Sequence, residues 1–293
     1  LKPITKNFSM LLFKNVENLK RFLREEKSKH ARIGFVPTMG ALHEGHLSLV
    51  SMAKENNDIV VASIFVNPTQ FNDPEDLKKY PRTEAADILL LGRTKCDVLF
   101  LPATDEIYPA GKTLNFSVAM KNLDSVMEGT FRPGHFEGVM QVVKRLLDIV
   151  EPDELIMGQK DFQQFAVIQN MIEQLSIPVK LIMGATLRES DGLAMSSRNV
   201  RLSNEGRKKA PLIFKTLSSV KENIFSKSAE DWKEWAMTQL SEGGFEPEYF
   251  EIVDGKTLQP VKRFGDNSYL VACTAARIDG VRLIDNVIIL NRE

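Results

Sequence analysis

Residues 33–50 read IGFVPTMGALHEGHLSLV, and this stretch decides the fold of the region around it. A β-branched apolar run at 33–36 is followed by a loop that contains Gly40, and then by a helix that we predict to begin near Glu44. A buried strand, a short loop and a helix form the unit from which parallel sheets are built. The two histidines of this stretch, His43 and His46, fall in the first turn of the predicted helix.

The same unit recurs between Ala31 and Met183. We predict strands at 33–36, 59–66, 98–101, 155–157 and 179–183, and helices at 44–55, 84–93, 138–150 and 162–175. The strands are apolar almost throughout, which is typical of strands buried on both faces of a parallel sheet. The sequence therefore predicts an α/β protein whose N-terminal domain is a doubly wound, Rossmann-like parallel sheet.

The pattern changes after Thr186. A loop precedes two helical stretches and three alternating runs, at 188–202, 204–226, 230–241, 249–253, 269–274 and 282–290 in that order. The alternation, with turn residues such as Asp254 and Gly255 between the runs, predicts a small antiparallel sheet. We place the domain boundary near residue 187, with one domain at 1–187 and a smaller α+β domain at 188–293.

The composition is that of a globular protein, with 43% hydrophobic and 26% charged residues among 293, which excludes a disordered chain. Lys and Arg (38) nearly balance Asp and Glu (39), so no general basic field favours nucleic acid. No apolar run approaches the ~18 residues that a membrane span needs. Cys96 and Cys273 are too few for a disulfide scaffold, and no signal-peptide core follows Lys2 and Lys6. We expect a cytoplasmic protein that binds neither nucleic acid nor membranes.

The helix start near residue 44 is the first candidate site. Helix N-termini present amide hydrogens and a partial positive charge that suit a phosphate, and Gly45 allows close approach of a nucleotide. The imidazoles of His43 and His46 can donate hydrogen bonds to phosphate oxygens as charge moves in a transition state. Zinc is a poor alternative, because the histidines are three residues apart and the sequence has no further Cys/His cluster. An ordinary helix start remains an alternative.

The second candidate, GQKDFQQ at 158–164, also lies directly after a short buried strand and before a helix. Lys160 can reach phosphates as a point charge, and Asp161 can hold a ribose hydroxyl or cap the helix. A surface turn with a capping aspartate is the alternative. Both candidates lie at carboxyl ends of strands in one sheet, where doubly wound folds bind their ligands.

Three further segments carry polar residues suited to the same site. The loop DGLAMSSRN at 191–199 has two hydroxyls and a guanidinium that could close over a triphosphate, although a plain hydroxylated linker would look similar. Arg132 and His135 precede a predicted helix and add charge. The segment 67–82, with three prolines and dense charge, is predicted to be a long loop, either a lid or a solvated connector. The sequence does not favour a phosphate-loop kinase or a dehydrogenase, because it has neither a Walker lysine loop nor a GxGxxG motif.

Four of these stretches, 37–46, 67–71, 158–164 and 195–199, have an order and separations that resemble the pantoate–β-alanine ligase (pantothenate synthetase) family. His-x-Gly-His alone would indicate only the wider nucleotidyltransferase superfamily. The resemblance starts near Met10, so we expect residues 1–9 to be additional. It implies a cytoplasmic, homodimeric enzyme of coenzyme A biosynthesis that uses ATP and Mg²⁺ to join pantoate to β-alanine through a pantoyl adenylate.

The resemblance also implies roles for individual residues. His46 is the expected catalytic group, supported by His43, Lys160 and Arg198. Gln70 and Gln164 match residues that hold pantoate, and Gln70 also matches a residue near β-alanine. The implied ATP-binding residues are Met39, Gly40, Ala41, Leu42, His43, Glu44, Gly45, His46, Gly158, Gln159, Lys160, Asp161, Leu187, Met195, Ser196, Ser197 and Arg198. Leu187 stands where the family has valine, a mild change because the implied contact is through the backbone. The metal ligands are not assigned.

Two other functions remain open. A cytidylyl- or adenylyltransferase of the same superfamily would need a basic pocket for a phosphorylated acceptor, whereas the amides of Gln70 and Gln164 suit a substrate with a hydroxyl and a carboxylate. A regulatory or RNA-binding module on the same fold is opposed by the near-zero net charge and by the lack of a basic patch interleaved with aromatic residues.

Overall fold

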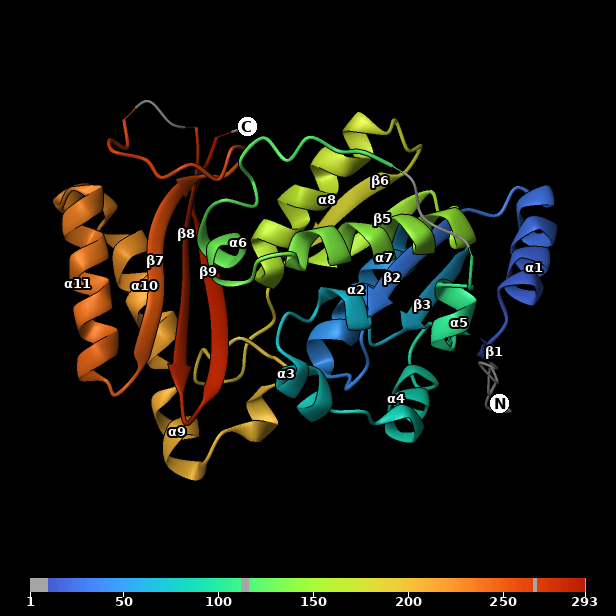
Figure 1. Cartoon of the computed structure of the whole chain (residues 1–293), viewed down its shortest axis with the longest axis horizontal. Coiled ribbons are helices and arrows are strands. Elements are labelled where there is room, and N and C mark those ends of the chain that lie inside the picture. Colours follow the sequence, from blue (N-terminus) through green and yellow to red (C-terminus); the bar gives the residue numbers. More distant parts are fainter. Residues whose placement is uncertain (1–9, 112–115, 266–267, 293) are drawn as a thin grey trace, which may run out of the picture. The chain divides into compact units, whose positions relative to one another are not determined.

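The computed structural model describes residues 10–111, 116–265 and 268–292 (Figure 1). The chain divides into a first unit, Leu1–Ser117, Glu137–Gly158 and Met171–Gly184, and a second unit, Val118–Phe136, Gln159–Asn170 and Ala185–Glu293. The chain passes from the first unit to the second for the last time between residues 184 and 185, close to the predicted boundary near residue 187. Two segments that the sequence assigned to the first domain, 118–136 and 159–170, belong to the second unit. The predicted additional residues 1–9 lie outside the described residues.

The first unit is built on a six-stranded sheet in which every pairing is parallel. The strands are β1 Leu11–Phe13, β2 Ile33–Thr38, β3 Ile59–Ile64, β4 Val98–Phe100, β5 Glu154–Gly158 and β6 Lys180–Gly184, and their order is β1-β4-β3-β2-β5-β6. The prediction of a doubly wound parallel sheet is confirmed. The direction of strand addition reverses between β2 and β5, and doubly wound sheets bind ligands at such a point.

Helices connect these strands. They are α1 Val16–Ser28, α2 Glu44–Asn56, α3 Pro74–Lys79, α4 Glu84–Leu91 and α5 Thr104–Ile107. Two further helices, α7 His135–Val150 and α8 Phe162–Gln174, each begin in the second unit and end in the first. α2 begins at the predicted residue and packs against β2, β3, β5 and β6. Its buried residues Leu49, Val50 and Ala53 join the core of the first unit, and this fixes the helix start beside the end of β2.

Burial differs between the centre and the edge of this sheet. In β2 the side chains from Ile33 to Val36 are all buried, as the continuous apolar pattern predicts. In β6 only Gly184 is buried, so the expectation of burial on both faces is wrong for this strand. The reason is its place at the edge, where β5 is its one neighbour among the described strands of the sheet.

The segment 67–82 is not a continuous loop. It contains the 3₁₀ turn η1 Pro68–Gln70 and the helix α3 Pro74–Lys79, so the prediction of a long loop is wrong for its second half. The helix starts at Pro74 because Asp73 caps it, accepting a hydrogen bond from the backbone N of Glu75 at 2.9 Å, and because proline is well suited to a first helical position.

The second unit contains the predicted antiparallel sheet. Its strands are β7 Glu246–Asp254, β8 Tyr269–Ile278 and β9 Val281–Asn291, and its helical elements are α6 Met127–Phe131, η2 Gln159–Asp161, η3 Asn199–Arg201, α9 Asn204–Lys209, α10 Leu212–Glu222, η4 Ile224–Ser226 and α11 Ala229–Glu242. α10 packs on β8 and β9, α11 packs on β7, and Trp232, Phe250 and Leu270 lie in the core that they form. Asp279 and Gly280, with φ of 53° and 70°, make the tight turn between β8 and β9. No helix in the described part of the chain has the length and apolar character to cross a membrane.

Candidate active site

The start of α2 lies directly beyond the end of β2 in the first unit. Gly40 and Ala41 have φ of +80° and +49°, which turns the chain sharply between the two elements. A Cβ atom at residue 40 would lie 3.0 Å from Ile64 Cγ2, so both the backbone angle and the space favour glycine. His43 is the N-cap residue of α2 and His46 is its third residue, as the sequence predicts.

The two histidines of this turn are held against each other. Their ring centroids are 4.0 Å apart, and His46 Nδ1 accepts a hydrogen bond from the backbone N of His43 at 3.3 Å. Because Nδ1 of His46 is an acceptor, the neutral ring carries its proton on Nε2. The local structure thus presents an imidazole N–H donor at the carboxyl edge of the sheet.

Asp87 of α4 is a residue that the sequence reasoning missed. Its side chain is 1% exposed and accepts hydrogen bonds from the backbone N of Ala41 at 2.9 Å and of Leu42 at 2.8 Å. Thr83 Oγ1 donates to it at 3.1 Å. The amides of residues 41–43 are therefore bound to acceptors within the protein, and these hydrogen bonds hold the turn before α2 in place. The one available signal was an acidic residue directly before the apolar run ILLL of this helix.

Gln70 follows β3 in η1 and is 7% exposed. Its Nε2 donates to Met39 Sδ at 3.1 Å, and its Oε1 accepts from Asn67 Nδ2 at 3.1 Å. The structure therefore brings a predicted pantoate-binding residue into contact with a predicted ATP-binding one. Asn67, within the recognised motif but given no role, holds the amide in place.

Gly138 in α7 allows this arrangement. Asn67 Nδ2 donates to the carbonyl of Gly138 at 3.1 Å. A Cβ atom at residue 138 would overlap the carbonyl of Thr69 and lie 2.8 Å from Gln70 Cα. The helix can approach the backbone at residues 69 and 70 only because residue 138 has no side chain.

The turn at 159–161 in the second unit is fixed from a distant strand. Asn286 Nδ2, in β9, donates to the carbonyls of Gln159 at 3.0 Å and Lys160 at 2.9 Å, and Gln159 Nε2 donates back to Asn286 Oδ1 at 3.0 Å. The adjacent Asp285 pairs with Arg188 at 2.6 and 3.0 Å. Burial raises the pKa of Asp285 even though Arg188 opposes the shift. No pattern in the sequence indicates these contacts, since the partners are more than 90 residues apart.

The predicted loop residues 195–198 also lie in the second unit. The backbone N of Met195 donates to the carbonyl of Leu187 at 3.0 Å, which joins two predicted ATP-binding positions. The backbone N of Arg198 donates to Ser196 Oγ at 3.3 Å, and Asn199 Nδ2 donates to the carbonyl of Ala194 at 3.0 Å. The segment is thus a hydrogen-bonded turn that leads into η3.

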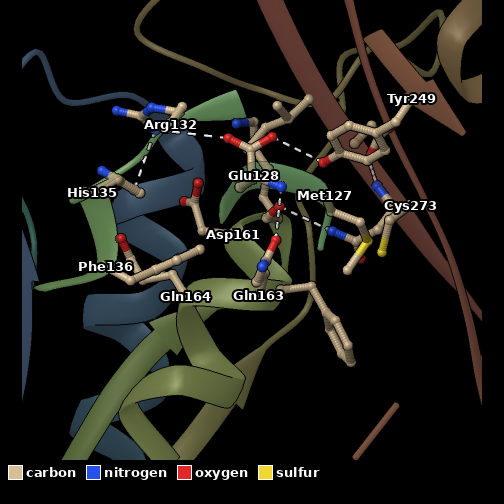
Figure 2. Close-up of a pocket in the computed structure, with 15 residues that line it drawn as sticks. Met127, Glu128, Arg132, His135, Phe136, Asp161, Gln163, Gln164, Tyr249 and Cys273 are labelled. Atoms are coloured by element: carbon tan, nitrogen blue, oxygen red, sulfur yellow. Dashed lines mark hydrogen bonds and ion pairs between the residues drawn. The ribbon is translucent and has the colours of Figure 1, made fainter. Parts of the chain in front are cut away.

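A pocket of about 420 Å³, its open mouth included, is lined by residues of the second unit alone (Figure 2). Among them are Lys160, Asp161 and Gln164, which the sequence singled out, and Arg132 and His135, which it marked as charged without assigning a role. The structure therefore gathers five polar side chains from two short segments around one cavity.

Glu128 anchors the wall of this pocket. Its side chain is 9% exposed and accepts two hydrogen bonds of 2.7 Å from Arg282 and one of 2.9 Å from Tyr249 Oη. Burial by itself would raise the pKa of the Glu128 carboxyl, but its hydrogen bonds to Arg282 and the charges of Arg282 and Arg132 hold that pKa below its usual range. Gln163 Oε1 accepts from the backbone N of Glu128 at 2.9 Å.

We expect Glu128→Gln to lower the free energy of unfolding by about 1–3 kcal/mol at pH 7, because Arg282 then loses one of its two carboxylate partners and keeps only Glu248. A carboxyl whose pKa is lowered by folding stabilises the protein above its unfolded pKa of ~4.3 and stops doing so as the pH falls through its folded value. Urea unfolding of both proteins should therefore show a difference that narrows below about pH 4. Glu251→Gln, which removes an ion pair with Lys233, is the control. A difference that is constant with pH would contradict the assignment.

The predicted site residues fall into two groups, one in each unit. Residues 39–46, Gln70 and Gly158 belong to the first unit, and Gln159, Lys160, Asp161, Gln164, Leu187 and residues 195–198 belong to the second. Within residues 10–111, 116–265 and 268–292, no cluster of three or more His, Cys, Asp or Glu side chains is arranged to hold a metal ion.

The sheet and its strand ends define the class of the protein. A doubly wound parallel sheet, with one recognised polar motif after β2 and another after β5 on either side of the reversal point, is the architecture of α/β proteins that bind nucleotides. The family model described as pantoate-beta-alanine ligase matches residues 11–288, and the chain belongs to this family.

Relatives match nearly the full length of the chain. The pantothenate synthetase of Cytophaga hutchinsonii is 43% identical over 287 residues, covering 96% of this chain and 100% of its own. That of Porphyromonas gingivalis is 45% identical over 279 residues, covering 95% and 99%. The crystal structure of pantothenate synthetase from Thermus thermophilus has a TM-score of 0.89 at 40% identity, covering 96% and 100%. The pantoate-beta-alanine ligase from Francisella tularensis, complexed with β-γ ATP and β-alanine, has a TM-score of 0.80 at 36% identity, covering 96% and 98%.

Proposed function

We infer that this chain is a carbon–nitrogen ligase that condenses (R)-pantoate with β-alanine and converts ATP to AMP and pyrophosphate. The observation that carries the conclusion is the match of the family model over residues 11–288. The Francisella tularensis relative, complexed with β-γ ATP and β-alanine, supports two of the three substrates. The direct test is to incubate the protein with MgATP and pantoate, with and without β-alanine, and to follow AMP.

The reaction that we propose has two steps. A pantoate carboxylate oxygen attacks the α-phosphorus of ATP, and the bond to the β-phosphate breaks to release pyrophosphate. The amine of β-alanine then attacks the acyl carbon of the pantoyl adenylate, loses a proton and displaces AMP. Both steps shift negative charge onto phosphate oxygens, so positioned donors and cations accelerate them.

We propose that residues 39–46, 158–161, Leu187 and 195–198 hold ATP. The fixed Nε2–H of His46 supports its role as a donor to the developing charge, with His43 beside it. The role of Lys160 is supported by the hydrogen bond from Asn286 Nδ2 to its carbonyl, which fixes the turn that carries it. Arg198, with Ser196 and Ser197, would stabilise the departing pyrophosphate.

Mg²⁺ belongs to this proposal as part of the substrate. Magnesium is commonly bound through nucleotide phosphates with one or two carboxylates, rather than by a cage of protein ligands. It would enter with ATP and need no three-residue cluster. We also propose a homodimer that works in the cytoplasm, on the ground of the family to which the chain belongs.

Gln70 and Gln164 are the proposed pantoate ligands, and their alanine variants should separate pantoate binding from ATP binding. We expect the KM for pantoate to rise about 10- to 100-fold, because each lost amide leaves a polar group of the substrate unpaired at about 1–3 kcal/mol. ATP affinity, measured by calorimetric titration without pantoate, should change less than threefold. Gln169→Ala in α8 is the control. A large loss of ATP affinity would remove Gln70 or Gln164 from the pantoate site.

A further inference from the structure

The side-chain amide of Gln70 has a direction, because its nitrogen donates hydrogen bonds and its oxygen accepts them. A carboxylate can only accept, so an acid substrate distinguishes the two ends of such an amide. The Gln70 side chain is 7% exposed and lies in the first unit, so its surroundings are groups of the protein. On the basis of the proposed function, in which Gln70 binds pantoate, we ask which residues fix the direction of this amide.

Asn67 connects the Gln70 amide to a backbone carbonyl. The carbonyl of Gly138 can only accept, so the end of Asn67 that lies 3.1 Å from it is the Nδ2 donor. The same Nδ2 donates to Gln70 Oε1 at 3.1 Å, which makes Oε1 the acceptor. The other end of the amide, Gln70 Nε2, lies 3.1 Å from Met39 Sδ. The direction of the Gln70 amide thus follows from the direction of the Asn67 amide.

The oxygen of Asn67 is bound as fully as its nitrogen. Oδ1 accepts from the backbone N of Thr69 at 3.4 Å, from Thr69 Oγ1 at 3.1 Å and from Tyr108 Oη at 2.9 Å. The Asn67 side chain is 1% exposed. The shortest of these three bonds comes from Tyr108, which is 41 residues away along the chain. A hydroxyl from outside the turn at 67–70 therefore helps to fix Asn67.

Tyr108 is itself held in place at the end of α5. Its backbone N donates to the carbonyl of Thr104 at 2.8 Å, and Arg145 Nε in α7 donates to the carbonyl of Ile107 at 3.0 Å. The Tyr108 ring packs against Phe65, with 6.2 Å between the ring centroids. Backbone and ring are both fixed, so the hydroxyl is directed at Asn67 with little freedom.

The Tyr108 hydroxyl remains a donor at neutral pH. Burial raises the pKa of this hydroxyl above its ordinary value, although the hydrogen bond to Thr69 opposes the shift. The hydroxyl is therefore protonated under working conditions, and the oxygen of Asn67 is its acceptor at 2.9 Å.

We propose that Tyr108 is a positioning residue for pantoate. Its hydroxyl fixes the amide of Asn67, and Asn67 in turn holds the amide of Gln70 in the direction that suits an acid substrate. An amide held in the opposite direction would place its oxygen on the side of Met39, and two acceptors repel each other. All of these residues belong to the first unit.

The first test removes a single oxygen atom. Tyr108→Phe keeps the ring that packs on Phe65 and deletes the hydroxyl. We measure pantoate-dependent ATP–pyrophosphate exchange without β-alanine and expect the KM for pantoate to rise about 5- to 10-fold, as for one neutral hydrogen bond. The maximal exchange rate, and the affinity for ATP measured by calorimetric titration without pantoate, should each change less than threefold. Tyr269→Phe, in β8 of the second unit, is the matched control and should behave as the wild type.

A double-mutant cycle distinguishes positioning from a general structural effect. In a Gln70→Ala background, Tyr108→Phe should raise the KM for pantoate less than twofold further, because the amide whose direction it fixes is absent. A tyrosine that bound pantoate by itself, or that only supported the fold, would cause the same fold-change in both backgrounds. Thermal unfolding checks that each variant is folded.

Either of two results would overturn the proposal. An unchanged KM for pantoate in Tyr108→Phe would show that the hydroxyl does not position the substrate. Equal fold-changes with and without the Gln70 amide would show that Tyr108 does not act through Gln70. A failure of the proposed function is visible separately, because the wild type itself would then show no pantoate-dependent exchange.

Discussion

Replacement of His46 by alanine is expected to lower the turnover number by about 10²–10³-fold in a protein that remains folded, because one preorganised donor to a developing charge typically contributes that much. The structure supports both parts of this expectation. His46 Nδ1 is an acceptor for the backbone N of His43, so the neutral ring carries its proton on Nε2. The residues that bury α2 are Leu49, Val50 and Ala53, so the imidazole contributes little to the core.

Single-turnover measurements of AMP formation and thermal unfolding test the two parts separately. His30→Ala is a matched control, since His30 is an exposed histidine that follows α1. Lys160→Ala should show a similar loss of rate together with weaker ATP binding, because it also removes a cation from the phosphates. A His46→Ala variant with wild-type turnover would refute the donor role of this imidazole.

The second large effect concerns the order of the steps. If the chain forms a pantoyl adenylate, labelled pyrophosphate should exchange into ATP when pantoate is present, without any β-alanine, because the first step is complete and reversible on the enzyme. Omission of pantoate should reduce the exchange to background. A one-step ligation would need the amine before any exchange, and a nucleotidyltransferase would need a phosphorylated acceptor. Either of these requirements, if observed, would exclude the adenylate mechanism while leaving the fold unaffected.

The parallel sheet was predictable because its signals are local. Each strand is a short apolar run followed by a polar turn and a helix, and the start of α2 at Glu44 follows from the turn at Gly40 and the buried residues that come after it. The lower burial of the edge strand β6 was harder to predict from the sequence. The run at 179–183 is as apolar as the central strands, but only pairing order shows that β6 has a neighbour on one side.

The recognised motifs located the candidate residues. The residues that hold these candidates in place through hydrogen bonds could not be predicted from the sequence. Asp87 binds the backbone at 41 and 42, and Asn286 binds the turn at 159 and 160, each from far along the chain. Hydrogen bonds of this kind follow from tertiary packing and leave no periodic pattern. The ion pair of Glu128 with Arg282 is a further example, since the two residues are 154 positions apart.

The contact between Gly138 and the backbone at residues 69 and 70 bears on how such a ligase could acquire a new acid substrate. Gln70 sits where it does because a helix lies against its backbone, with no space for even a methyl group. Attempts to accommodate a bulkier acid by changing Gln70 alone would therefore leave the wall behind it unmoved. A change in this wall requires changes in α7 and in the turn at 68–70 together. A mutant library that varies both segments should therefore yield altered selectivity for the acid substrate far more often than a library that varies one segment alone.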